Sequence, residues 1–425
     1  SQTDFDIDPV TGFLPSEPLP RLSGQYKIWE DALAEAPEIL RLGEDLSEEA
    51  LALKTAGESW RVRMRLTPVL DIQPLTDQRL LQRAHVVLTW LVQYYVHSLP
   101  PALPPAPKIV PKSIAVPLVE VSRILRIAPV ITFADTVTWN WELIYPDKPV
   151  TIDNMAIVHS FSGREDEQHF YQVQATIELH GAHLLRMIEG YNQIPILDDC
   201  VSITRLARQM IEEMSNLIQS IRDGCNPYVF YWYMRPWYNG SGAKGPSDSG
   251  WIYEGVDSAV PELQYLSGPS GGQSAVIHVL DLFLGISHDK PEKDQDLKSR
   301  AKNGKAHQPQ GFMERMRMYM LGKHREYLQH LEKSPCFVRD VARRTPVLQG
   351  PYNNAIAALK KLRGLHMRIA ISYVVDMAKT TPPPAVNRLV PGIEEQGIEQ
   401  VRGTGGNEVA ILLKAGINAT AEVAL

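Results

Sequence analysis

The residue best placed to do chemistry is His366, which lies in the middle of an apolar stripe. Between residues 353 and 378, side chains at helical spacing form this stripe, and they are Ile356, Leu359, Leu362, His366, Ile369, Tyr373 and Met377. Two interpretations fit the pattern. His366 can be a core histidine hydrogen-bonded to a neighbour, or a neutral imidazole that a helix presents to an apolar cleft, as an axial haem ligand is presented. The pattern alone leaves both open.

A second residue that calls for a partner is Asp281. It lies in the stretch SAVIHVLDLFLGI, which is apolar nearly all round as a helix, so we expect its carboxylate to be buried. A buried carboxylate needs a cation or hydrogen-bond donors to offset its lost hydration. Arg363, one turn before His366, is a plausible cation. Such a pair would fix the orientation of the helix that carries His366.

Three further patterns have weaker support. Residues 268–272 match G-x-S-x-G, but the chain lacks the alternating strands and helices of an α/β-hydrolase, so close approach of the backbone to a flat cofactor is the other interpretation. Residues 240–245 match G-x-G-x-x-G, yet more loop follows where a dinucleotide site needs a helix. His180 and His183, with Glu178, could share a metal on one helix, although such residues more often form a solvated face.

The elements that must position these residues are helices. Apolar residues recur at intervals of three and four in residues 79–97, 168–188, 202–225, 273–286, 312–332 and 353–378. The best candidates for strands are 113–118 and 227–233, so the fold class is all-α. Residues 98–112 contain six prolines and cannot form a helix interior. We interpret them as a connector around a small N-terminal helical domain, residues 1–158, which precedes a large helical domain, residues 159–425.

Composition excludes several classes of protein. The net charge of −6 over 425 residues argues against a nucleic-acid-binding surface. No apolar run approaches the length of a membrane span, and the acidic first residues, SQTDFDIDPV, do not resemble a secretory signal. The three cysteines are widely spaced and odd in number, which argues against disulfides and structural zinc. We therefore expect a cytoplasmic protein with no nucleic-acid or membrane partner.

A longer series of motifs resembles one known family. In order and spacing, the chain is similar to the indoleamine 2,3-dioxygenases from about residue 10 to about residue 415. Upstream, the motifs are Ile114-Ala-Val-Pro117, Phe133-Ala-Asp135, Asn140-Trp141, Pro146-Asp-Lys-Pro149 and Asn154-Met155. Downstream, they are Asn226-Pro, Phe230, Arg235, Ile252-Tyr-Glu-Gly255, Ser267-Gly-Pro-Ser-Gly-Gly-Gln-Ser274, Asp281, Tyr319-Met, His324-Arg, Leu362-Arg-Gly-Leu-His366 and Gly403-Thr-Gly-Gly406.

The resemblance implies a role for each matched residue. The family binds haem b in its large helical domain, and His366 matches the proximal iron ligand. Arg235 matches the arginine that holds the substrate carboxylate, for which its planar fork of donors is suited. Phe230 and Tyr231 match aromatic positions near the indole, and Phe133 and Phe170 match distal-pocket aromatics. The remaining matched residues are Ser270, Gly271 and Gly272, where the backbone passes close to the haem, and Thr404, the lid threonine.

The implied reaction inserts both atoms of O₂ across the indole C2–C3 bond of L-tryptophan to give N-formylkynurenine. Its chemistry takes place at the haem iron, with no protein nucleophile or general base. One departure from the family is Gln174, which falls where relatives carry a small serine or a histidine over the iron. Two alternatives stay open: a haem oxygenase of the same scaffold acting on another indole in secondary metabolism, and a non-catalytic haem-binding sensor. We expect a monomer.

Overall fold

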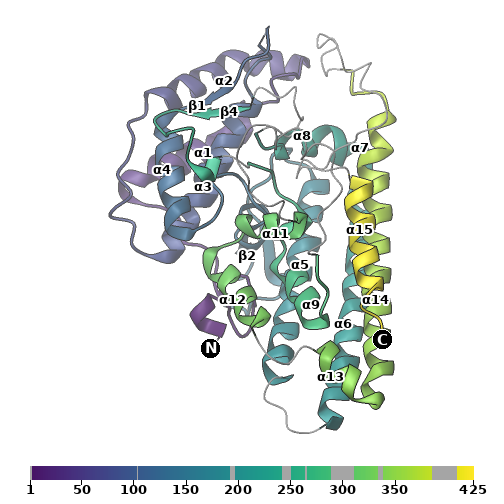
Figure 1. The fold of residues 1–425 in the computed structure, drawn as a ribbon. Coiled ribbons are helices and arrows are strands. Elements are labelled where there is room, and N and C mark those ends of the chain that lie inside the picture. Colours follow the sequence, from purple (N-terminus) through teal and green to yellow (C-terminus); the bar gives the residue numbers. More distant parts are fainter. Residues whose placement is uncertain are drawn as a thin grey trace.

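The structure is a computed structural model that describes residues 2–102, 104–191, 197–241, 250–263, 266–288, 311–333, 338–384 and 409–425. Its first part contains four helices: α1 (Lys27–Ile39), α2 (Glu48–Leu66), α3 (Gln78–His97) and α4 (Lys112–Leu125). Their labels gather on one side of Figure 1. The central helix α3 is buried along nearly its whole length, and Asp77 caps it by accepting a hydrogen bond from the Leu80 N–H.

The second part is organised around long helices. These are α5 (Glu165–Tyr191), α6 (Leu197–Gly224) and α14 (Pro346–Ala370), with α15 (Val409–Ala421) packed along α14 (Figure 1). Shorter helices complete this part: α9 (Ala275–Leu284), α11 (Phe312–Met316), α12 (Gly322–Glu332) and α13 (Val338–Arg344). The fold is all-α, as the periodicity of the sequence predicts.

Strands are short and few in the described parts of the chain. β1 (Lys108–Val110) pairs in parallel with β4 (Trp251–Tyr253), and β2 (Trp141–Leu143) pairs antiparallel with β3 (Met155–Ile157). The β1–β4 pair ties the end of the proline-rich connector to a segment far along the chain. None of the described helices is both long and apolar enough to span a bilayer.

Both predicted strands were wrong. Residues 113–118 belong to α4, and their continuous apolar run is too short for its periodicity to distinguish a strand from a helix. Residues 227–233 form the short helix α7 (Pro227–Val229) followed by a π-helical turn, Phe230–Met234. Asn226 caps α7 by accepting from the Tyr228 N–H, and proline begins the helix, so these local signals override the strand propensity of the aromatic residues.

Two hydrophobic clusters make up the core. One is centred on α3 and α4, and the other lies among α5, α6, α9 and α14. The first cluster contains Trp90 from α3 and also Trp237, so it continues beyond residue 158. The boundary near residue 158 therefore stays a prediction.

Candidate functional site

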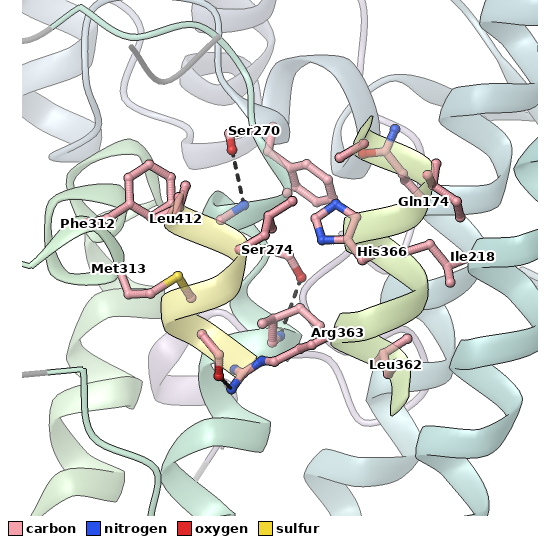
Figure 2. Close-up of a pocket in the computed structure, with 18 of the residues that line it drawn as sticks. Gln174, Ile218, Ser270, Ser274, Phe312, Met313, Leu362, Arg363, His366 and Leu412 are labelled. Carbon is pink, nitrogen blue, oxygen red and sulfur yellow. Dashed lines mark hydrogen bonds between the residues drawn. The ribbon is translucent and has the colours of Figure 1, made fainter. Parts of the chain in front are cut away.

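A cavity of about 590 Å³ opens between α5, α6, α14, α15 and the turn Gly271–Gln273. Its size is typical of ligand sites. Most of its walls are apolar, with Ile218, Leu362 and Leu412 from three different helices among the lining residues (Figure 2). Ten of the predicted site residues line the cavity, and they are Phe133, Phe170, Gln174, Phe230, Arg235, Ser270, Gly271, Gly272, Arg363 and His366.

Three π-helical turns border the cavity. They are Ala134–Thr138, Phe230–Met234 and Ile371–Val375, and each contributes at least one lining residue. A π turn holds an extra residue and shifts the phase of the side chains that follow, which is why such turns often occur at functional sites. Because each turn interrupts regular helical spacing, periodicity in the sequence did not reveal them.

His366 points its ring into the cavity from α14 (Figure 2). Burial, together with the charge of Arg363, lowers the pKa of His366, which favours a neutral imidazole with a lone pair to share. No hydrogen bond joins this ring to another described residue. The core-histidine interpretation required such a bond, so the geometry favours a ligand for something that enters the cavity.

The residues present fit a haem group better than a bare metal ion. Across the described part of the chain, no three His, Cys, Asp or Glu side chains are close enough together to hold a metal. His366 would therefore hold iron only as part of a group that brings its other ligands with it. A lone imidazole in an apolar cavity of this volume is the arrangement expected for haem.

The predicted pair between Asp281 and Arg363 is present. Burial alone would raise the pKa of Asp281, but the charge of Arg363 and a 2.7 Å hydrogen bond from His288 outweigh burial and hold that pKa below its usual value. Arg363 also donates to the Gly416 carbonyl, at 3.0 Å, and to the Thr420 hydroxyl. One guanidinium on α14 thus joins α9 to α15 beside His366.

Arg235 is the other cation of the cavity. It begins the short helix α8 (Arg235–Tyr238), directly after the second π turn, and lies largely buried in the cavity wall. Burial lowers the pKa of Arg235. Its guanidinium carbon lies 5.4 Å from the centre of the Tyr231 ring. A buried guanidinium favours an anionic partner because an anion offsets its lost hydration.

Aromatic rings cover the wall near Arg235. The Phe170 and Phe230 rings lie with their centres 5.0 Å apart, and Tyr373 meets Phe230 at 5.7 Å. Phe133 is buried at the start of the first π turn. Flat rings at these separations leave an apolar surface on which another aromatic molecule can stack.

Gln174 extends from α5 into the cavity (Figure 2). Its amide nitrogen donates a 3.1 Å hydrogen bond to the Phe170 carbonyl. Because one end of the amide is engaged in this way, its oxygen can accept a hydrogen bond from a ligand. Ser270 accepts a 3.2 Å hydrogen bond from the Gly272 N–H and shapes the neighbouring turn.

The glycines of this turn have different surroundings. A Cβ atom added at Gly272 would come within 2.7 Å of the Phe312 ring, so glycine is needed there for packing against α11. A Cβ atom at Gly271 would meet no protein atom within 4 Å. Ser270, Gly271 and Gly272 all line the cavity, and their predicted close approach to a cofactor stays a prediction.

Two predicted residues lie elsewhere, and a third is outside the described residues. Asp281 is behind Arg363, outside the cavity wall, and Tyr231 does not line the cavity either. Thr404 lies outside the described residues, as does most of the G-x-G-x-x-G match. His180 and His183 are exposed whereas Glu178 is buried on the opposite face of α5, so these three side chains do not converge.

Glu178, named above only as a possible metal partner of His180 and His183, lies in the cavity wall. Its side chain is buried, and one carboxyl oxygen accepts a hydrogen bond from the Ser274 hydroxyl. The other carboxyl oxygen has no hydrogen-bond partner among the described residues. Burial outweighs the Ser274 hydrogen bond and raises the pKa of Glu178 to about 7. The signal in the sequence that could have indicated this buried carboxyl group was an acidic residue on the apolar face of the predicted helix 168–188.

Comparison with known proteins places this chain in a family. The family model described as "Indoleamine 2,3-dioxygenase" matches residues 1–423. The chain is 28% identical to indoleamine 2,3-dioxygenase 1 of Rattus norvegicus, over 97% of this chain and 93% of that protein. It is 27% identical to indoleamine 2,3-dioxygenase of Saccharomyces cerevisiae, over 96% and 90%, and 26% identical to a 6-hydroxytryptophan 2,3-dioxygenase of Fusarium equiseti, over 96% and 94%.

Proposed function

The chain belongs to the indoleamine 2,3-dioxygenase family, and on that premise we propose that it is a haem-dependent enzyme that converts L-tryptophan and O₂ to N-formylkynurenine. One observation carries the proposal. A single cavity contains a neutral imidazole, His366, and a buried guanidinium, Arg235, in otherwise largely apolar walls. These are the two anchors needed for an iron-centred cofactor and for an aromatic amino acid.

Each group has a limited task in this proposal. A bound haem would supply the redox chemistry that places both oxygen atoms on the indole C2–C3 bond. His366 would hold the iron, and the Arg363–Asp281 pair would keep its helix in place. Arg235 would bind the substrate carboxylate, and the rings of Phe170 and Phe230 would orient the indole and exclude water.

The first experiment is mass spectrometry of the product formed from L-tryptophan and isotopically labelled O₂ by the reduced, haem-loaded protein. We expect a product that carries two labelled oxygen atoms. A product with one labelled atom would overturn the dioxygenase reaction. A second, equilibrium readout is the change in the haem absorption spectrum as the indole binds, which does not depend on turnover.

The role of Arg235 has a test of its own. Arg235→Leu should weaken L-tryptophan binding by about 2–4 kcal/mol, because a charge-assisted pair is lost. It should leave the binding of tryptamine, which lacks the carboxylate, nearly unchanged. Equal affinity of the unaltered protein for the two ligands would contradict a carboxylate-binding role.

A second candidate substrate is a ring-substituted tryptophan. It is favoured by Gln174, whose amide oxygen can accept a hydrogen bond within the cavity. The relative named 6-hydroxytryptophan 2,3-dioxygenase matches 96% of this chain at 26% identity, which is close to the 28% identity of the rat indoleamine 2,3-dioxygenase 1. Competition between L-tryptophan and 6-hydroxytryptophan for the haem-loaded protein, compared in Gln174→Ala, would separate the two substrates: only the hydroxylated one should lose affinity in the variant.

A further inference from the structure

A buried cluster of one carboxylate and two phenols lies beside the cavity. Its members are Glu167 and Tyr171 on α5 and Tyr238 at the end of α8. The Tyr171 hydroxyl donates to a carboxylate oxygen of Glu167 at 2.8 Å, the Tyr238 hydroxyl reaches the same oxygen at 3.2 Å, and the two hydroxyls lie 2.9 Å apart. Both tyrosines also line the cavity.

Glu167 makes no ion pair with any residue that the structure describes, although its side chain is fully buried. Other donors compensate for the missing cation. The Phe161 N–H donates to it at 3.0 Å, and the Ser162 N–H and hydroxyl donate at 2.7 and 2.6 Å. With the two phenols, five groups surround one carboxylate, which is what a buried anion without a cation requires.

The two phenols act as donors to this carboxylate. Burial, followed by the charge of Glu167, raises the pKa of Tyr171 and Tyr238 well above the usual value of tyrosine. Both hydroxyls therefore keep their protons over the working range of the protein. The cluster is a fixed arrangement of hydrogen bonds rather than a proton-transfer site.

The cluster connects the helix that carries Arg235 to the helix that carries the aromatic wall. Helix α8 has four residues, too few to be stable alone, so tertiary contacts must hold it. Trp237 provides one contact by stacking on Phe161, with ring centres 5.4 Å apart and planes at 5°. The Tyr238 hydroxyl provides a directional contact, to Glu167 on α5.

We propose that Glu167 is a positioning residue that, through the hydroxyls of Tyr238 and Tyr171, sets the place of Arg235 relative to the cavity wall and so determines selection of substrates with a carboxylate. The inference rests on the proposed function, in which Arg235 binds that carboxylate. No ion pair joins Glu167 to Arg235, so the effect passes through Tyr238 and the backbone of α8. The cluster itself does not touch the reacting atoms.

The test is removal of one hydroxyl with the ring retained. In Tyr238→Phe, we expect the ratio of tryptophan affinity to tryptamine affinity to fall about fivefold to tenfold, which is about 1–1.4 kcal/mol at 1.4 kcal/mol per factor of ten, because one of the hydrogen bonds that hold α8 is lost. Both affinities are measured by the change in the haem spectrum of the loaded protein. Tyr171→Phe should shift the ratio in the same direction, because that hydroxyl contacts both other members of the cluster.

Tyr253→Phe is the matched control. Its hydroxyl is also buried and donates a single hydrogen bond, to the Pro129 carbonyl at 2.7 Å, but it lies outside both the cavity wall and the cluster. It should leave the ratio unchanged. A loss of stability alone would lower the affinity for both ligands equally, and that result in Tyr238→Phe would overturn the inference.

Two results distinguish an error in the role of Arg235 from an error in the role of Glu167. If the unaltered protein binds tryptophan and tryptamine equally, the carboxylate-binding role of Arg235 is wrong and the inference falls with it. If the unaltered protein prefers tryptophan and Tyr238→Phe keeps that preference in full, only the positioning role of Glu167 is wrong.

Discussion

Replacing Glu178 by glutamine should change how the stability of this protein depends on pH. Burial, only partly offset by the Ser274 hydrogen bond, raises the pKa of Glu178 from 4.5 to about 7. Since each pH unit between the folded and unfolded pKa values corresponds to about 1.4 kcal/mol, ionisation of Glu178 in the folded chain costs about 3 kcal/mol. The contribution of the protonated group is complete below pH 4.5 and is lost as pH rises through 7.

Glutamine cannot ionise and keeps an oxygen that can accept from Ser274. The free energy of unfolding of Glu178→Gln, relative to that of the unaltered protein, should therefore rise by about 2–3 kcal/mol between pH 5 and pH 8. Urea unfolding at the two pH values measures this difference, with haem content matched between samples. Glu212→Gln is the control, because Glu212 is an exposed carboxylate on α6.

The control should change the free energy of unfolding by less than about 0.5 kcal/mol at either pH. If the difference between Glu178→Gln and the unaltered protein is the same at pH 5 and pH 8, Glu178 does not ionise within a buried site and the reasoning fails.

Three further predictions follow from the packing around the cavity. His366→Ala should abolish tight haem binding, and a variant with the haem content and absorption spectrum of the unaltered protein would contradict the ligand assignment. Asp281→Ala should lower the free energy of unfolding by about 3–5 kcal/mol, because it leaves the charge of Arg363 buried without its partner; a loss below about 1 kcal/mol in urea unfolding would show that the pair is not structural. Gly181→Ala should destabilise by about 1–3 kcal/mol, because the added methyl group would overlap a side chain of α9. Gly190→Ala on the same helix meets nothing and should stabilise by up to about 1 kcal/mol, so thermal unfolding of the two variants should shift in opposite directions.

Much of the helical framework could be predicted because its apolar residues repeat with the period of a helix. This holds for α6 and α14, where one face packs against the core and the other is more exposed, whereas α3 is buried along nearly its whole length. It fails in α4, because residues 114–119 are a continuous apolar run, and the periodicity of so short a run does not distinguish a strand from a helix. The aromatic run after Asn226 failed for a different reason, since its residue types favour strands whereas its cap and its tertiary contacts favour a helical path.

Some single residues could be placed from the sequence, and others could not. Asp281 could be matched with Arg363 from the sequence, because a carboxylate in an apolar helix requires a cation and Arg363 lies one turn before His366. Tyr231 could not be placed in this way. Its ring lies near the Arg235 guanidinium outside the cavity wall, and a π turn determines that direction. A motif match predicts which segment lies near the site, but it does not predict the direction in which each side chain of that segment points.

By itself, the sequence determined which residue types could do chemistry and which helices would carry them: one imidazole on an apolar stripe, one buried acid with its arginine, and family motifs along almost the whole chain. Only the tertiary structure decided which of these side chains share one cavity. Burial is a property of contacts between segments far apart in the chain. It is burial that lowers the pKa of His366 and raises that of Glu178, and it places Glu167 among five donors with no ion pair to any described residue.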